Sequence, residues 1–317
     1  MAFQLDQLRT LVALVDEGTF DAAATRLRVT ASAVSQRIKA LESEAGRVVV
    51  QRTNPVTPTE AGDVLLRYAR QVVLLDADAA RLLGPGISGS AGVDGAGDTD
   101  SPLEVVSLPL AVNADSLGTW FLDALARVPA GLAVTFDLHR DDQEHTASLL
   151  RSGTVMAAVT STADPVQGCR TEPLGVMRYL AVCTPGFRDR WLGGSARAAR
   201  LAAAPVVDFD RKDGLQQRYL AETVGEVSTR RHFVPTSHDF ARAVTLGLGW
   251  GLLPEQQCRS EVDRGDLVLL SPRHHVDVPL YWQRWTIGSD LLDAVTDAVR
   301  AAAREALRRP SRGGAAG

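Results

Sequence analysis

The sequence predicts a multidomain protein, with a small all-α domain at the N-terminus and a larger α/β domain after it. Three observations support this. The chain has 317 residues, more than one hydrophobic core usually holds. Up to residue 83 the apolar residues follow helical spacing only, whereas after residue 102 short β-branched runs alternate with helical stretches. Between them, residues 84–102 hold six glycines and three aspartates, which is typical of a flexible hinge.

The composition excludes several classes of protein. The chain is 45% apolar and 23% charged, an ordinary globular balance. It has no apolar run of about 18 residues and no signal-like start, so we expect a cytoplasmic protein without membrane contact. Its three cysteines lie far apart, so we expect no metal site. The net charge of −4 does not indicate nucleic-acid binding, but residues 24–58 carry six basic side chains against two acidic ones.

Residues 5–44 predict three short helices joined by tight turns. Apolar residues recur at steps of three and four from Leu5, and Gly18 is suited to end this first helix. Thr19 can cap a second helix rich in small alanines, and Thr30 can cap a third that runs to about residue 44. This arrangement is typical of a helix-turn-helix.

The third helix has an apolar face and a polar face, and a wing is expected after it. The polar side chains are of types that read base edges in a major groove, although a solvated helix face is the alternative. A strand at 48–50 and a turn at Asn54-Pro55 predict a β-ribbon wing, with Arg52 placed to meet a phosphate. The candidate DNA-binding residues are Thr30, Ser32, Ser35, Gln36, Arg37, Lys39, Arg52, Thr57 and Thr59.

Residues 59–83 predict a long helix that pairs with a second copy of the chain. Thr59 is a suitable N-cap, and apolar residues then recur at alternating steps of three and four. Pairing with the same helix of another subunit buries this stripe and yields a homodimer. The alternative is that the stripe packs on its own domain. The expected dimerisation residues are Leu65, Tyr68, Val72, Leu75, Ala79 and Leu82.

This N-terminal part resembles the winged helix-turn-helix of LysR-type transcriptional regulators. The resemblance spans about residues 3–62 and rests on AAA before the turn, SAVSQRIKALE in the third helix and T-x-AG at the start of the long helix. Most of that family has Leu-Phe before the wing arginine, where this chain has Val-Val-Val-Gln51. That departure is similar to the branch that regulates lysine and arginine exporters, called ArgP or LysG.

The C-terminal part predicts an open α/β sheet with polar residues at its strand ends. Ligands of such sheets bind beyond the carboxyl ends of the strands. The expected strands are residues 104–113, 134–138, 155–160, 205–209, 233–235 and 278–285, followed by a terminal helix at about 289–308.

The same part resembles the effector domain of these regulators, which has two α/β lobes and is like a periplasmic binding protein. The segments AVNADSLGTWF, AVTS, GLGWGLLPE and VPLYWQRW carry this resemblance over most of residues 104–300. The expected domains are a winged helix-turn-helix at 1–58, a dimerising linker helix at 59–83, a flexible Gly-rich hinge at 84–102, an effector-binding domain at 103–309 and a disordered tail at 310–317.

The residues at the strand ends favour a small zwitterionic ligand. Backbone N–H groups and the Ser116 hydroxyl at a helix start could bind a carboxylate, and several aspartates could bind amino groups. The candidate effector-binding residues are Asn113, Asp115, Ser116, Trp120, Asp142, His145, Thr160, Asp210, Asp213, Thr236, Ser237 and Trp250. Simpler roles stay open: Asp115 as an N-cap, Trp250 in the core, His145 on the surface, and the other aspartates as loop charges.

The resemblance implies a regulator that binds double-stranded operator DNA as a homodimer or homotetramer and works with RNA polymerase. It further implies that lysine or arginine is the effector, that an exporter gene is controlled, and that no cofactor is needed. A helix-turn-helix fused to a biotin ligase is one alternative, but only Lys39 and Lys212 could serve as its catalytic lysine, so we expect no enzyme. A nucleoid-associated DNA-binding protein without effector control is the other, and the acid-rich cleft argues against it.

Overall fold

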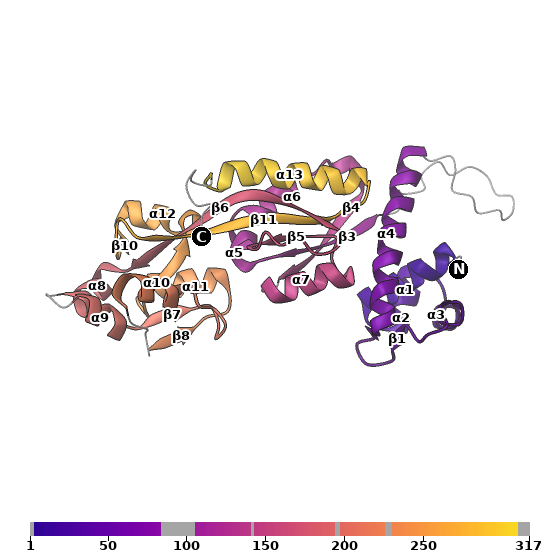
Figure 1. Cartoon of the computed structure of the whole chain (residues 1–317), viewed down its shortest axis with the longest axis horizontal. Coiled ribbons are helices and arrows are strands. Elements are labelled where there is room, and N and C mark those ends of the chain that lie inside the picture. The colour runs from indigo at the N-terminus through magenta and orange to yellow at the C-terminus, as the bar shows by residue number, and fades with distance from the viewer. Residues whose placement is uncertain (1–2, 84–104, 141–142, 194–196, 226–229, 310–317) are drawn as a thin grey trace.

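The predicted fold class is confirmed, because an all-helical domain with a small wing precedes an α/β domain of two lobes (Figure 1). The hinge expected at 84–102 and the tail expected at 310–317 lie outside the described residues. The computed structural model describes residues 3–83, 105–140, 143–193, 197–225 and 230–309, without the side chains of residues 143–145, 197 and 198.

Three short helices form the N-terminal domain, and the residues expected to bound them do so. Gly18 ends the first helix with a φ of +72°, a left-handed conformation that glycine adopts at little cost. The hydroxyls of Thr19 and Thr30 cap the next two helices by accepting hydrogen bonds from backbone N–H groups, each at 3.2 Å. The elements are α1 (Leu5–Glu17), α2 (Phe20–Leu27), α3 (Ala31–Ala45) and the long α4 (Glu60–Leu83).

The wing is a two-stranded antiparallel ribbon and is shorter than its sequence suggested. Its strands are β1 (Val50–Gln51) and β2 (Thr57–Pro58), so the strand predicted at 48–50 begins two residues later. Val48 is 64% exposed because it precedes the ladder, whereas Val49 is buried in the domain core. A backbone hydrogen bond of 2.7 Å from Val56 N to Gly18 O ties the wing to the turn between α1 and α2.

The C-terminal domain is built on a mixed seven-stranded sheet. The strand order is β10-β6-β11-β5-β3-β4, with β9 also paired to β6, and a separate parallel pair joins β7 to β8. β3 runs parallel to β4 and β5, whereas β11 runs antiparallel to β5 and β6. The bounds are β3 (Val106–Val112), β4 (Val134–Arg140), β5 (Ala157–Thr160), β6 (Cys169–Cys183), β7 (Val206–Asp208), β8 (Arg231–Phe233), β9 (Gly251–Pro254), β10 (Val268–Leu269) and β11 (His275–Trp285).

Two long strands, β6 and β11, cross from one lobe to the other, and sequence reasoning did not predict β6. β11 pairs with β6 along its own whole length, from His275 with Leu180 to Trp285 with Cys169. Lobe I consists of β3–β5, α5–α7 and α13, and lobe II of β7–β10 and α8–α12. The register shifts between Leu280 and Tyr281, near the point where the strands pass between the lobes.

Helices cover both faces of the sheet in lobe I. In Figure 1, α13 lies along one face and α7 along the other. One hydrophobic core runs from lobe I into lobe II, and Leu74 of α4 is part of it. The remaining helices are α5 (Ala114–Ser116), a π-helical turn η1 (Leu117–Phe121), α6 (Leu122–Ala126), a 3-10 turn η2 (Ala130–Leu132), α7 (Gln143–Ser152), α8 (Pro185–Leu192), α9 (Arg197–Ala203), α10 (Leu215–Val224), α11 (Ser237–Thr245), α12 (Glu255–Arg264) and α13 (Asp290–Ala306).

Candidate functional site

The expected recognition helix, α3, turns its polar side chains to solvent. Val34, Ile38 and Leu41 are fully buried against the other helices of the domain. Ser32, Gln36 and Lys39 are exposed on the opposite face, and Ser35 is half-buried beside them. Side chains of these types on an exposed helix face can donate and accept hydrogen bonds at base edges.

Two arginines, one on α3 and one on the wing, contact neighbouring side chains. Arg37 forms an ion pair of 3.3 Å with Asp6 of α1. The Arg52 guanidinium lies 5.5 Å from the centre of the Phe20 ring, a stacking geometry that leaves the charge exposed.

The two wing threonines have local partners. The Thr57 hydroxyl lies 3.2 Å from that of Thr53. The Thr59 hydroxyl accepts a hydrogen bond from Gly62 N at 3.0 Å and donates one to Val48 O at 2.8 Å. Thr59 therefore caps α4, as expected, and its hydroxyl is engaged within the domain.

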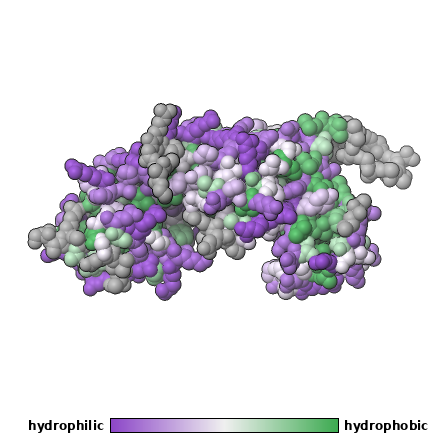
Figure 2. All heavy atoms as spheres, viewed as in Figure 1, coloured by the Kyte–Doolittle hydropathy of each residue, from purple (hydrophilic) through white to green (hydrophobic). Residues whose placement is uncertain are grey.

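The apolar stripe on α4 is exposed except near the start of the helix. Leu65 is 7% exposed and lies in the core of the N-terminal domain, because the first turns of α4 pack against α1. It is therefore not part of an exposed seam, whereas Leu75 and Leu82 are exposed, and hydrophobic atoms gather along α4 in Figure 2. The exposed or partly exposed members of the stripe are Tyr68, Val72, Leu75, Ala79 and Leu82, with Val64 and Leu83 beside them.

A cleft of about 1130 Å³ lies between the two lobes of the C-terminal domain. Its walls come from strand ends and helix starts of both lobes, and part of its floor comes from the crossing strands β6 and β11. Of the predicted effector-binding residues, the cleft is lined by Asn113, Asp115, Thr160, Asp210 and Asp213. Charged or amide side chains that also line it are Arg140, Lys212, Gln216, Arg218, Gln257 and Asp277.

Asp115 lies where lobe I, lobe II and the crossing strands meet. Its carboxylate accepts one hydrogen bond of 2.7 Å from the Tyr179 hydroxyl on β6 and another of 2.7 Å from the Ser237 hydroxyl on α11. Gln257 of α12 donates in turn to the Ser237 hydroxyl, also at 2.7 Å. Both observed donors to Asp115 are neutral hydroxyl groups, so among the described residues its negative charge is hydrogen-bonded but not paired with a cation.

Burial makes the charged form of this carboxyl group costly. Desolvation raises the pKa of Asp115 above its usual value, the hydrogen bonds from Ser237 and Tyr179 oppose this rise, and the charge of Asp213 adds to it. Desolvation, followed by the nearby Asp115, also holds the pKa of Tyr179 well above its ordinary value, so the phenol stays a donor. A cation that entered the cleft would stabilise the charged form of Asp115.

The start of α5 does not present the Ser116 hydroxyl to the cleft, in contrast to the sequence-based expectation. The Asn113 side chain accepts the hydrogen bond from Ser116 N at 2.8 Å, so the cap of the helix uses that N–H group. The Ser116 side chain is fully buried and does not line the cleft. Asn113 therefore lines the cleft, and its side-chain oxygen serves as the N-cap of α5.

Both tryptophans expected to cover a ligand lie in the core. Trp120 is 2% exposed and packs edge-on against Phe121, and Trp250 is fully buried beside Tyr219. Neither lines the cleft. Both side chains therefore serve to pack the core, which was the alternative role considered for Trp250.

Several other predicted residues have local roles. Thr236 caps α11 by accepting from Asp239 N at 3.3 Å and does not line the cleft. Asp210 and Asp213 line the cleft, but their carboxylates also accept backbone N–H groups of their own loop. Asp142 and the side chain of His145 lie outside the described residues.

Comparison with known proteins places both halves of the chain in one family. Residues 5–63 match "Bacterial regulatory helix-turn-helix protein, lysR family", and residues 108–304 match "LysR substrate binding domain". The chain belongs to the LysR family. Its two matched regions coincide with the helix-turn-helix and with the two-lobed domain that holds the cleft.

Relatives of this LysR-family chain match it over nearly its full length. It is 46% identical to the lysine export transcriptional regulatory protein LysG of Corynebacterium efficiens, over 95% of this chain and 98% of the relative. The crystal structure of ArgP from Mycobacterium tuberculosis superposes with a TM-score of 0.79 at 42% identity, over 96% and 98% of the two chains. Full-length LysG of Corynebacterium glutamicum with bound effector Arg gives 0.71 at 42% identity, over 96% and 99%.

Sequence reasoning on this LysR-family chain missed two residues on the crossing strands β6 and β11 that support the cleft. Tyr179 lies on the unpredicted strand β6, so no motif indicated it. Gln283 of β11 is 1% exposed; its amide donates to Thr162 O at 3.3 Å and to Asp164 O at 3.0 Å, and accepts from Val166 N at 3.2 Å. Gln283 thus holds the loop that follows Thr160. A buried amide in an apolar strand was the one signal that could have marked it.

Among the described residues, no group of histidine, cysteine, aspartate or glutamate side chains could hold a metal ion. In the same part of the chain, no helix is both long and apolar enough to cross a membrane.

Proposed function

We propose that this LysR-family regulator senses arginine or lysine in the cleft between its lobes and controls a gene for export of that amino acid. The observation that carries the proposal is Asp115, a desolvated carboxylate at the cleft that is met by two neutral hydroxyl groups. A guanidinium or ammonium group would supply the missing charge. The full-length LysG of Corynebacterium glutamicum, with its bound effector Arg, supports the same ligand class.

The remaining charges of the cleft suit the other end of an amino acid. Arg140 and Arg218 are exposed on its two sides, from the end of β4 and from α10. A ligand with its cationic group at Asp115 could direct its carboxylate toward either arginine. The cleft volume of about 1130 Å³ leaves room for such a molecule and water.

We further propose that residues 1–58 bind operator DNA, that the 59–83 helix pairs two copies, and that residues 103–309 bind the effector. Gln36 and Lys39 would read bases, and Arg52 would meet a phosphate. The exposed stripe on α4 supports a homodimer, or a tetramer of two such pairs. Such a regulator acts with RNA polymerase on the chromosome, hence in the cytoplasm, and needs no catalytic activity.

Calorimetry of the full chain with each of the twenty amino acids tests the ligand. Arginine or lysine should bind, and neutral and acidic amino acids should bind far more weakly because they leave Asp115 unbalanced. A gel-shift titration on the DNA upstream of its own gene, with and without the bound amino acid, tests the regulatory part. DNA binding without any amino acid binding would refute the proposal and favour a nucleoid-associated role.

A further inference from the structure

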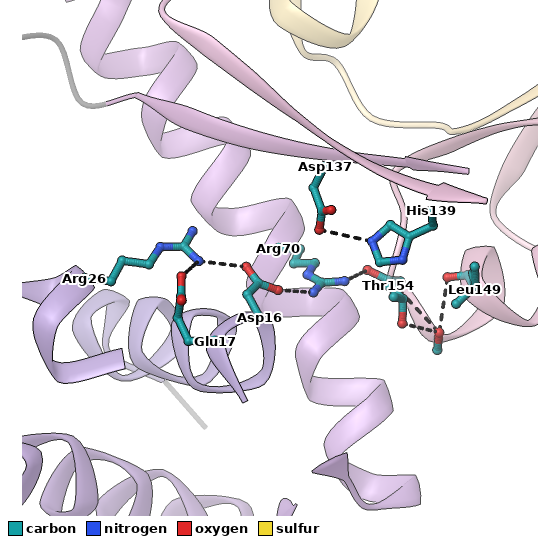
Figure 3. Close-up of polar contacts among 10 residues, drawn as sticks. Asp16, Glu17, Arg26, Arg70, Asp137, His139, Leu149 and Thr154 are labelled. Carbon is teal, nitrogen blue, oxygen red and sulfur yellow. Dashed lines mark hydrogen bonds and ion pairs between the residues drawn. The ribbon is translucent and has the colours of Figure 1, made fainter. Parts of the chain in front are cut away.

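The long helix α4 docks on lobe I of its own chain through one buried arginine. Arg70 is 7% exposed, and its guanidinium contacts two parts of the molecule at once (Figure 3). One nitrogen donates to Asp16 at the end of α1, and the other donates to Gly153 O in lobe I at 2.8 Å. A guanidinium fits this task because its fixed planar donors can serve two acceptors.

The backbone at the docking point is built for close approach. Gly153 has a φ of +73°, and a Cβ atom there would lie 2.6 Å from the Arg67 Cα, closer than atoms can pack. One helical turn before Arg70, Arg67 donates to Arg151 O at 3.2 Å and stacks over the Trp285 ring at 5.5 Å. Leu74, one turn later, enters the core of the C-terminal domain. The contact between α4 and lobe I therefore extends over about two turns of the helix.

The other partner of Arg70 connects to the helix-turn-helix. Asp16 also accepts from Arg26 of α2 at 3.2 Å, and Glu17 meets the same guanidinium nitrogen at 3.2 Å. In Figure 3, Asp16 lies between Arg26 and Arg70. A continuous set of charged hydrogen bonds thus runs from α2, through the end of α1, to α4 and lobe I.

The lobe I partner of Arg70 is joined to the walls of the cleft. Gly153 directly follows α7, whose Thr146 lines the cleft. It also precedes β5, and Thr160 at the far end of that strand lines the cleft as well. A displacement of α7 or β5 by a ligand would therefore move the carbonyl group that Arg70 binds.

We propose that Arg70 is a positioning residue that couples occupancy of the cleft to the placement of the DNA-binding domain. The inference rests on the proposed function for the identity of the ligand. A buried guanidinium is stable only where its acceptors surround it, so this bridge favours one placement of α1 and α4 on lobe I. If the ligand shifts Gly153, the free energy of that placement changes, and DNA binding must in turn change ligand affinity by the same factor.

The test measures that factor on the full chain. Arginine affinity is determined by calorimetry with and without a saturating duplex from upstream of its own gene, and the ratio of the two dissociation constants gives the coupling. A wild-type ratio of about 5 to 150 in either direction is typical of coupled sites. Arg70→Gln should bring the ratio close to one while arginine binding without DNA, and DNA binding without arginine, both remain.

Two further variants separate coupling from general damage. Arg9 forms an ion pair of 2.7 Å with Asp76, which joins the same two helices, α1 and α4, so Arg9→Gln removes a contact between these helices and should keep the wild-type ratio. Asp16→Asn keeps an acceptor but removes its charge, so it should bring the ratio part of the way toward one. It also serves as the test variant should Arg70→Gln not fold.

The outcomes are distinct. The coupling would be overturned if the wild type binds arginine but its ratio of dissociation constants is one. It would also be overturned if the ratio is unchanged in Arg70→Gln or Asp16→Asn, or if Arg9→Gln brings the ratio toward one as much as Arg70→Gln does. If no amino acid binds the wild type, the proposed function fails and the DNase footprint of the ligand-free protein decides. The length of DNA protected should then change in Arg70→Gln and not in Arg9→Gln, and an unchanged footprint in Arg70→Gln would overturn the positioning role.

Discussion

Replacing Asp115 with asparagine tests the ligand hypothesis because affinity and stability should respond differently. The substitution keeps the shape and one carbonyl acceptor but removes the negative charge. One of the two hydroxyl donors, on Tyr179 or Ser237, loses its acceptor. The loss of one hydrogen bond to a charged group costs about 1.5–3 kcal/mol, while removal of a desolvated charge stabilises the ligand-free protein.

The expected magnitudes follow from those two contributions. The free energy of unfolding of ligand-free Asp115→Asn should stay within about 1 kcal/mol of wild type, because the lost bond and the relieved desolvation have opposite signs. Arginine binding should weaken by about 2–3 kcal/mol, which is roughly 30- to 150-fold. The lower end of the range for charged pairs applies because Asp115 keeps some exposure to the cleft.

Calorimetry for affinity and urea unfolding for stability measure both quantities on the same preparation. Asp123→Asn is a matched control, since Asp123 is an exposed aspartate of lobe I that does not line the cleft. It should change neither quantity. Arginine binding of wild-type strength in Asp115→Asn would refute the assignment of the cationic group to this carboxylate. A large loss of stability would show that Asp115 is chiefly structural.

Four other predictions concern the pH dependence, the DNA contacts, the dimer and the cleft loop. A bound cation should hold the pKa of Asp115 below its raised ligand-free value. Arginine should therefore bind with full affinity at a pH above the ligand-free pKa, and its affinity should fall as the pH drops through that pKa. Calorimetry at several pH values should show this fall in the wild type and not in Asp115→Asn. Gln36→Ala should lose about 1–3 kcal/mol of DNA-binding free energy and relax the preference at one base position. Arg52→Ala should weaken the binding of all DNA sequences alike and reduce the slope of log affinity against log salt by about one. The reverse pattern in gel-shift titrations would exchange their roles. Leu75→Glu should dissociate the dimer in sedimentation experiments, and an unchanged mass would remove α4 from the interface. Gln283→Leu should lower stability by about 1–3 kcal/mol or more and weaken arginine binding, because Val166 N and two loop carbonyls lose their partner; a variant as stable as wild type would contradict this role.

The sequence predicted the N-terminal domain well because its determinants are local. Thr19, Thr30 and Thr59 cap the helices that follow them, and Gly18 ends the helix before it. Each of these preferences depends on a few neighbouring residues. The fate of Leu65 could not be read in the same way, because its position fits both a seam between subunits and the core of its own domain.

The C-terminal domain was predicted less completely because its key contacts are long-range. Asp115 was expected at the cleft, but its partners Tyr179 and Ser237 are 64 and 122 residues away in the chain. Ser116 and Trp120 were assigned to the ligand because a polar or aromatic side chain after a strand can face either a cleft or the core. Their direction is set by packing with distant elements, which spacing alone does not reveal.

The crossing of β6 and β11 between the lobes makes lobe II a continuous insert in the chain. The segment that enters it at Val176 and leaves it at Pro279 has paired ends, because these two residues face each other in the ladder. Recombination between relatives could therefore exchange residues 176–279 as one block, with both junctions already held side by side. Lobe I, made from the stretches on either side, has to be inherited as two pieces. The lobe II side of the cleft can thus diversify without altering the lobe that α4 docks against.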